Sequence, residues 1–428
     1  MTFIYHLISI DRKFILPLRA DQRPFGVPTM SSCLSSPAGF RFDPASTEYV
    51  DDPYPTYKVL RDHYPAHHVP EHGLWLITRH ADVQSALTNP AVWSSSRGNV
   101  PVDTAVRVGR TLGTLDPPRH DELRSVINKG VTPARVRALL PEAREHARER
   151  AAAFAQNRGG DVVGEFGRPI LNRTLARLVG LDAEGAQRGA QLVEAALDTT
   201  AAVIGSVGTP ETSARIFNFL HEQVTQREDS VSADSIADDF LTVLIAARKR
   251  GAPLSNEEIA ANMMTVLMAG SASVVHFFGN LIRALWLHPD QKKAVQADRS
   301  LLDAAIEEAV RWDTSTPCFA RQVLSDVEVA GTRIPQGSRA LIFLASANRD
   351  ERAFDNPDQF NIHRKRTRHL GFGAGPHQCL GSYTAWQVCR VLLEELLPVI
   401  GNFEIEAEKA VRTRFIMFRG FQTLPIRF

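Results

Sequence analysis

The stretch Phe372-Gly373-Ala374-Gly375-Pro376-His377-Gln378-Cys379-Leu380-Gly381 sets a single cysteine in a glycine-rich loop, with a histidine two residues before it. A long helical pattern follows at once, over about residues 380–400. Helix N-termini and loop N–H groups stabilise anions, and the thiolate is the form of cysteine that binds metal. The loop therefore favours Cys379 as an anionic, soft metal ligand.

A lone axial thiolate is known on haem iron, where it donates electron density that favours O–O bond cleavage. The alternative interpretation of Cys379 is a buried structural cysteine beside a glycine-rich helix start, since free cysteine is among the most buried residue types. Taken alone, the residue does not decide between the two. The ten-residue pattern around it favours haem ligation.

The composition suits one large or two medium compact domains. The chain has 428 residues, of which 44% are hydrophobic, and a formal net charge of +1. This length supports a sizeable core, and a near-neutral charge argues against general nucleic-acid binding. The four cysteines show no CxxC pairing. Their spacing speaks against a zinc site or a disulfide framework and suits a reducing cytoplasm.

The N-terminal part of the chain is expected to lie outside the fold. Its most apolar stretch is interrupted by charged residues and lacks a signal-peptide cleavage site. Residues 1–38 are rich in Pro and Ser, so we expect a poorly ordered extension, in which Met30 could be the natural start. Residues 39–428 form the predicted folded domain. No apolar run reaches the ~18–20 residues of a membrane span, so we expect no membrane association.

Helical patterns dominate the folded part, and strand signals are short. Strands are predicted at residues 74–78, 327–334 and 339–343, the last two in a hairpin-like arrangement. The sequence thus predicts a mainly α fold with a small β lobe. Besides the two long helices described here, helices are predicted at about residues 81–87, 121–128, 133–156, 169–179, 183–203, 210–227 and 234–248.

The longest predicted helix covers residues 255–287. Ser255-Asn256-Glu257-Glu258 is a capping-box pattern, and His288-Pro289 supplies the stop. At ~1.5 Å per residue the helix spans about 50 Å, so a mostly apolar helix of this length should be buried centrally. Gly270 at its middle has two interpretations: close packing of another helix, or a bend that lets a ligand approach the backbone.

With this helix beside the Cys379 loop, the chain resembles the soluble bacterial cytochromes P450 over about residues 39–428. Residues 372–381 match the haem signature Phe-Gly-x-Gly-x-His-x-Cys-x-Gly at every fixed position. Glu308 and Arg311 match the family's Glu-x-x-Arg pair, and their spacing allows an ion pair on one helical face. The resemblance implies the P450 fold, with the long central helix over haem b and Cys379 as the axial iron ligand.

The resemblance also implies which other residues hold the haem. Phe372 and Gly373 belong to the haem loop itself. Two buried propionates need charge-assisted donors, which basic side chains provide. Four basic residues resemble the family's propionate partners: His120, Arg124, Arg321 and His377.

The middle of the long helix departs from the family. The family pattern Ala-Gly-x-Asp/Glu-Thr is here Ala269-Gly270-Ser271-Ala272-Ser273. In the family an acid–alcohol pair relays two protons to the distal oxygen through water. Ala272 cannot titrate, whereas Ser273 can still donate a hydrogen bond or hold a water. We expect the substrate's polar group or ordered water to complete the relay, and Gly270 to open the helix for oxygen-derived ligands.

Residues 94–98, 347–350 and 419–425 resemble the corresponding segments of bacterial monooxygenases that O-demethylate or hydroxylate para-substituted benzoates and methoxyarenes. In that group an arginine and serines help to seat the substrate carboxylate, and Arg97 falls in the corresponding loop. On the long helix, however, the group's arginine and two serines are Met264, Thr265 and Met268 here. This exchange favours a more neutral or larger apolar substrate.

By family position, the substrate pocket is expected to be mostly apolar with few polar anchors, and core packing is the alternative for each of its side chains. The expected pocket residues are Arg97, Val100, Met268, Ala269, Ser271, Thr316, Pro317, Cys318, Phe319 and Met417.

The resemblance implies a cytoplasmic monooxygenase that inserts one oxygen atom of O2 into a small, mostly apolar substrate, aromatic compounds included. NAD(P)H would supply electrons through a separate ferredoxin and ferredoxin reductase, because the chain has no Gly-rich nucleotide fingerprint. Neither nucleic acid nor membrane is an expected partner. A peroxide-driven peroxygenase is the first alternative. A non-catalytic haem-binding sensor, supported only by the missing acid, is the alternative of another class.

Overall fold

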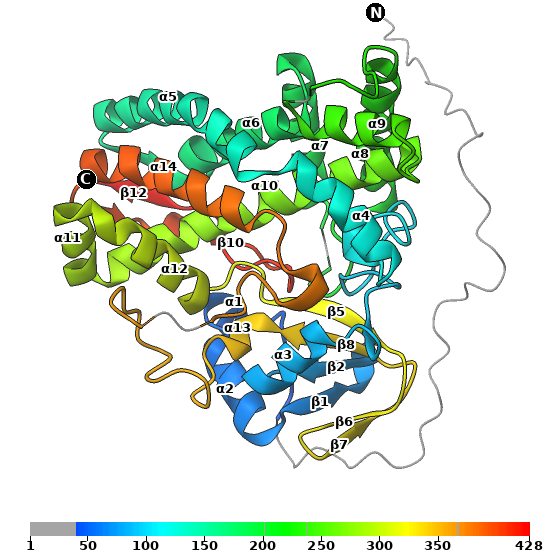
Figure 1. Ribbon diagram of the computed structural model, residues 1–428. Helices are drawn as coiled ribbons and strands as arrows, with labels where there is room; N and C mark the ends of the chain where they lie inside the picture. The colour runs from blue at the N-terminus through cyan, green and yellow to red at the C-terminus, as the bar shows by residue number, and fades with distance from the viewer. Residues whose placement is uncertain (1–39, 201, 237, 366–367) are drawn as a thin grey trace, which may run out of the picture. The chain divides into compact units, whose positions relative to one another are not determined.

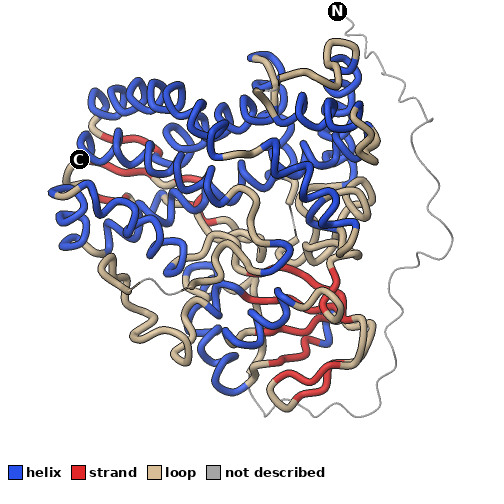
Figure 2. Tube along the Cα trace, in the orientation of Figure 1, coloured by secondary structure: helices blue, strands red, loops and turns tan. Residues whose placement is uncertain are grey.

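The computed structural model describes residues 40–428, except 201, 237, 366 and 367. The predicted extension over residues 1–38 lies outside the described residues. Residues Phe42–Phe428 form one compact unit. Figure 2 shows that most strands of this unit gather in one lobe, while helices build the remainder. The prediction of a mainly α fold with a small β lobe is confirmed.

The β lobe is built on a five-stranded sheet of order β1-β2-β8-β5-β3. Only β2 and β8 pair in parallel. The predicted hairpin is confirmed as β6 (Val327–Val329) and β7 (Thr332–Ile334), but residues 339–343 do not join it. They form a central strand of the larger sheet instead. The strands of that sheet are β1 (Ala66–Val69), β2 (Leu74–Ile77), β3 (Trp93–Ser94), β5 (Cys318–Val323) and β8 (Arg339–Phe343).

Four short helices belong to the β lobe, and two small strand groups lie in the helical part (Figure 1). One group has the order β4-β12-β9, and β10 pairs with β11. The helices are α1 (Thr47–Asp51), α2 (Tyr54–His63), α3 (His80–Thr88) and α13 (Leu344–Ala347). The strands are β4 (Gly159–Asp161), β9 (Glu404–Ile405), β10 (Val411–Arg412), β11 (Phe421–Thr423) and β12 (Pro425–Arg427).

The helical part contains the long helices. Two predicted boundaries were wrong: the helix at 183–203 ends at Asp198, and the helix at 234–248 begins only at Phe240. Asp239 caps the latter, because its carboxylate accepts a hydrogen bond from the Thr242 N–H at 2.8 Å. The helices are α4 (Arg119–Ile127), α5 (Pro133–Asn157), α6 (Arg168–Val179), α7 (Ala183–Asp198), α8 (Pro210–Glu228), α9 (Phe240–Lys249), α10 (Asn256–Leu287), α11 (Pro289–Ala297), α12 (Leu302–Trp312) and α14 (Ser382–Ile400).

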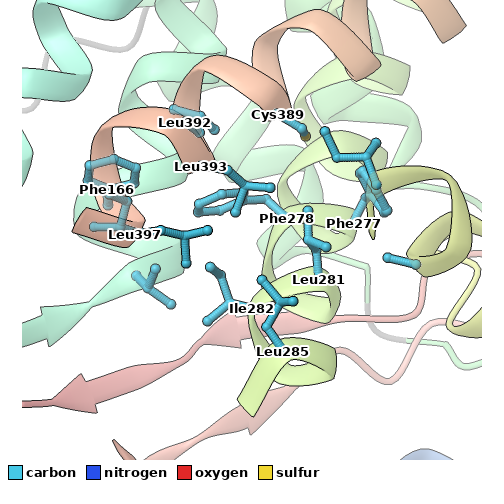
Figure 3. Packing of buried hydrophobic residues seen from close by; sticks show 14 of the residues in the cluster. Phe166, Phe277, Phe278, Leu281, Ile282, Leu285, Cys389, Leu392, Leu393 and Leu397 are labelled. Atoms are coloured by element: carbon cyan, nitrogen blue, oxygen red, sulfur yellow. The ribbon is translucent and has the colours of Figure 1, made fainter. Parts of the chain in front are cut away.

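Helix α10 runs through the middle of the helical part (Figure 1). The predicted capping box is present, with Ser255 as the N-cap and Glu258 as its partner. Figure 3 shows side chains of α10, among them Phe278 and Leu281, packed near Leu393 and Leu397 of α14. In the described part of the chain, α10 alone is long and apolar enough to cross a membrane, and 67% of its apolar window is buried within the fold. Burial explains its apolar composition, as in the core helix of a globular protein.

Candidate functional site

One cavity of about 330 Å³ lies between the middle of α10 and the loop that precedes α14. The loop side contributes Phe372, Gly373 and Cys379. The α10 side contributes Ala269, Gly270 and Ser273. The two segments that the sequence singled out, about 100 residues apart in the chain, therefore face one shared space.

The loop holds Cys379 by its backbone and by the start of α14. Its N–H donates to the carbonyl of Phe372 at 2.8 Å. Helix α14 begins at Ser382 rather than at residue 380, so Cys379 lies just before the helix. The Cys379 side chain is exposed to the cavity but lies deep in the fold, where desolvation raises the pKa of its thiol. The N–H groups of Gly381 and Ser382 and the Arg124 guanidinium lower this pKa. A metal that binds sulfur would shift this balance to the thiolate.

Close backbone packing seats the loop against the β lobe. Gly373 and Gly375 have φ of 71° and 68°, in the left-handed region that favours glycine. A Cβ on Gly375 would lie 2.5 Å from the carbonyl oxygen of Leu87 in α3. The glycines of the motif thus set the loop conformation and its approach to α3.

The four predicted propionate partners lie together beside this loop. Arg124, Arg321 and His377 line the cavity, and His120 does not. The ring of His120 packs against that of His377, with 4.5 Å between the ring centres. Among the described residues, neither the Nε2 atom of His120 nor that of His377 has a hydrogen-bond partner, although both atoms are buried.

This cluster of basic side chains has more hydrogen-bond donors than acceptors, which suits two bound carboxylates such as the haem propionates. Burial, with Arg321, His120 and Arg124 nearby, lowers the pKa of His377 to about 3. Burial likewise lowers the pKa of Arg321 to about 10. A bound dianion would pair with these groups and satisfy the orphaned nitrogen atoms. The residues present therefore fit haem: Cys379 would hold the iron and the four basic residues the propionates.

The Glu308–Arg311 pair lies behind the site and is buried. Two hydrogen bonds join the guanidinium and the carboxylate, at 2.7 and 2.9 Å. Arg311 also donates to the carbonyl oxygens of Asn348 and Pro357. Arg364 adds a third contact to Glu308 at 3.1 Å. The pair therefore anchors the chain between residues 348 and 364.

The α10 face differs from the prediction at Gly270. The helix is continuous across this residue, so the expected opening of the backbone is absent. A Cβ on Gly270 would lie 2.7 Å from the terminal methyl groups of Leu175 in α6. Of the two interpretations, close packing of a neighbouring helix is the one that the structure supports, although Gly270 also lines the cavity.

Ser273 and Ala272 differ in their access to the cavity. The hydroxyl of Ser273 donates to the carbonyl oxygen of Ala269 at 2.6 Å, one turn earlier in α10. Its oxygen atom therefore keeps lone pairs that can accept a hydrogen bond. Ala272 is buried and does not line the cavity.

Five of the predicted substrate residues line the cavity besides Ala269, and four do not. Ser271 lies on the opposite face of α10 from Ala269, and Arg97 is exposed. Cys318 alternates with Phe319 along β5, so it faces away, with its sulfur 3.8 Å from that of Met417. Pro317 lines a separate small cleft. The residues that line the cavity are Val100, Met268, Thr316, Phe319 and Met417.

The sequence argument missed a polar part of the lining. Asn99, Asp103, Thr104 and Arg107 lie between β3 and α4 and face the cavity. Their segment has no periodic pattern, and tertiary packing alone brings it to the site. Thr174 and Leu178 of α6 are further lining residues of this kind.

Three features surround one cavity: the Cys379 loop, a basic cluster in which buried nitrogen atoms lack partners among the described residues, and the apolar side of α10. Together they define a haem-thiolate protein. The family model for cytochrome P450 matches residues 208–427. The putative cytochrome P450 123 of Mycobacterium tuberculosis is 32% identical over 392 residues, which cover 90% of this chain and 96% of that protein. The chain therefore belongs to the cytochrome P450 family, whose members are haem monooxygenases with a cysteine thiolate on the iron.

Other similarities agree with this assignment. The vitamin D(3) 25-hydroxylase of Pseudonocardia autotrophica is 28% identical over 391 residues, covering 89% of this chain and 95% of that one. The solved structure of cytochrome P450 CYP109Q5 from Chondromyces apiculatus superposes with a TM-score of 0.80 at 28% identity, over 90% and 97% of the two chains. The P450 fold and the use of O2 with a small organic substrate follow.

Proposed function

We propose that the chain hydroxylates or O-dealkylates a small, mostly apolar substrate, with Cys379 as the iron ligand and Ser273 at the oxygen-binding side. The overall reaction is RH + O2 + two electrons + two protons, giving ROH + water. Haem, when bound to a thiolate, supplies the activation of O2. The observation that carries the proposal is the shared cavity, with Cys379 on one wall and the Ala269–Ser273 face of α10 on the other.

The chain's own residues position the substrate. Val100, Met268, Phe319 and Met417 offer apolar contacts along the cavity. Such a wall orients a substrate by shape and excludes water from it. The proposed substrate is therefore apolar over most of its surface.

Proton delivery is proposed to depend on Ser273 and on a group that the protein side chains do not provide. The Ser273 hydroxyl already donates to Ala269, so its oxygen can accept a hydrogen bond from a water or from a polar group of the substrate. Either would hold a transferable proton beside the site of oxygen binding. Ala272 leaves no carboxyl at the position where relatives carry one.

Electrons are proposed to come from NAD(P)H through a ferredoxin and its reductase, in the cytoplasm. The chain has no nucleotide-binding fingerprint of its own. On α14, Trp386 packs against the core, and the Arg390 guanidinium lies 5.8 Å from its ring centre. This surface would select the partner protein.

The test compares two electron supplies for the haem-loaded protein with a panel of methoxyarenes and terpenoids. We expect product with NADH, a ferredoxin and its reductase, and much slower turnover with hydrogen peroxide alone. Efficient peroxide turnover with no gain from the donor proteins would show a peroxygenase, which the missing acid at Ala272 favours. NADH consumption without product across the panel would instead favour a haem-binding sensor.

A further inference from the structure

The cavity has a polar corner that the proposed function does not use. Most of the cavity surface is apolar, but Asn99, Asp103, Thr104 and Arg107 contribute polar atoms to it. They lie on the segment between β3 and α4, apart from the Cys379 loop and the propionate partners. In an apolar cavity, a few fixed polar groups decide how a ligand is oriented.

Asp103 organises this corner. Its side chain is only 1% exposed, and its carboxylate pairs with the Arg107 guanidinium at 2.8 Å. It also accepts hydrogen bonds from the N–H groups of Asn99 and Thr104, at 3.2 and 2.9 Å. Gly98 makes room for it, because a Cβ there would lie 2.3 Å from the Cβ of Asp103. The charges of Asp103 and Arg107 cancel, so the pair adds no net charge to the corner.

Asn99 is held at three of its atoms. Its N–H donates to Asp103, and its carbonyl oxygen accepts from the N–H of Ala320 at 2.9 Å. Its side-chain oxygen Oδ1 accepts from Nη2 of Arg107 at 3.1 Å. Because a guanidinium can only donate, the amide oxygen must face Arg107, and this fixes the opposite direction for the Nδ2 group.

The Nδ2 group of Asn99 lies against Gly113, another residue that lines the cavity. A Cβ on Gly113 would lie 2.8 Å from Nδ2. No atom of the described residues accepts a hydrogen bond from Nδ2, whereas the hydroxyl of Thr104, also without a partner among them, is enclosed by the protein. Nδ2 can therefore donate to a ligand in the cavity at no cost in protein–protein hydrogen bonds.

We propose that Asn99 anchors an uncharged oxygen acceptor of the substrate. The substrate class is then a neutral molecule with an apolar body and a carbonyl, ether or hydroxyl oxygen. A carboxylate is disfavoured as the group at Nδ2, because the Arg107 guanidinium is already paired with Asp103 and offers the ligand no free charge. The inference rests on the proposed function only in assigning this cavity to the substrate.

The first experiment measures binding to the ferric haem-loaded protein by optical difference spectra. Two pairs of probes share a carbon skeleton and differ in one carbonyl: propiophenone with propylbenzene, and menthone with p-menthane. We expect each ketone to bind about 5- to 10-fold more tightly than its hydrocarbon partner, as for one neutral hydrogen bond. 4-Methoxybenzoate should bind more weakly than the ketones. Absence of a ketone preference in both pairs, or tightest binding of the benzoate, overturns the proposal.

The second experiment locates the preference. Asn99→Ala removes the donor, and Gly113→Ala displaces it without removing any polar group. Both variants should lose the ketone preference, measured in each variant as the ratio of ketone affinity to hydrocarbon affinity. Asn157→Ala, at the exposed end of α5, should leave it unchanged. A ketone preference that persists in both Asn99→Ala and Gly113→Ala contradicts the proposal.

Failure of the two proposals can be told apart. The spectral titrations need only ferric haem, without O2, electrons or turnover. Absence of product with the donor proteins would remove the monooxygenase proposal while the probe comparison still decides the anchor. Conversely, product formation with no ketone preference would leave the activity in place and remove the anchor.

Discussion

At the scale of the residue, the chemistry of the site depends on a few polar atoms that lack a hydrogen-bond partner in the described part of the chain or bond to the backbone. His120 and His377 each carry a buried nitrogen without a partner among the described residues, which suits an anionic cofactor. The Ser273 hydroxyl donates its hydrogen bond to the helix backbone, so only its oxygen atom can accept one from another group. The sequence identifies these residues by their motifs but does not show their hydrogen-bond partners, which depend on the folded structure.

Ser273 gives the first prediction. Ser273→Ala removes the oxygen that would hold a proton-carrying water or substrate group, so product formed per NADH should fall by about 10-fold or more. NADH should still be consumed, with hydrogen peroxide as the by-product. The measurement is product, peroxide and NADH in one reaction.

Ser271→Ala is the matched control, because Ser271 lies on the opposite face of α10 and does not line the cavity. It should keep the wild-type ratio of product to NADH. An unchanged ratio in Ser273→Ala, or an equal loss in both variants, would remove Ser273 from proton delivery.

At the scale of the element, helix positions could be predicted from the sequence because capping residues, apolar patterns and prolines act locally. The capping box of α10, its apolar length and its proline stop placed this helix to within one residue of its observed start. The pairing of β8 with β2 and β5 was not predicted, because strand pairing joins segments far apart in the chain. The segment 99–113 has neither helical nor strand period, so its polar corner could not be found from the sequence.

Gly420 gives the second prediction, because it lets the C-terminal segment cross α10. A Cβ there would lie 2.4 Å from the Cβ and 2.7 Å from the Cα of His276. Neither atom can move without shifting the helix, so Gly420→Ala should lower the free energy of unfolding by about 1–3 kcal/mol. Thermal unfolding of the haem-loaded protein measures this loss.

Gly270→Ala is the comparison, because the nearest neighbours of its Cβ would be side-chain atoms of Leu175, with the two methyl groups closest. Those methyl groups can turn aside, and alanine gains ~1 kcal/mol of helix propensity over glycine. The loss should therefore be smaller than for Gly420→Ala. The reverse order of the two losses would contradict this account of how α6 and the C-terminal segment pack on α10.

At the scale of the whole molecule, buried polar groups make the fold sensitive to acid. His276 of α10 is buried, and its ring nitrogen Nδ1 contacts the carbonyl oxygen of Phe421 at 3.2 Å. Burial lowers the pKa of His276 from 6.5 to about 4. The unfolded chain therefore binds a proton between these values that the folded chain does not.

The sign of the third prediction follows from this difference. The His276 contribution to stability is complete above pH 6.5 and is lost as the pH falls towards about 4. The full loss is about 3 kcal/mol. Urea unfolding between pH 7 and pH 4.5 should show a steeper decline in the wild type than in His276→Gln. Parallel curves for the two proteins would show that His276 is not the group responsible.

The central claim is that Cys379 is the thiolate ligand of a haem, and the reduced–CO spectrum tests it most directly. The wild type should show the red-shifted Soret band of thiolate ligation, which Cys379→Ser should lose and Cys389→Ala, a change of a buried cysteine within α14, should retain. A wild type without that band, or a Cys379→Ser variant that keeps it, would contradict the assignment of the iron ligand and with it the proposed chemistry.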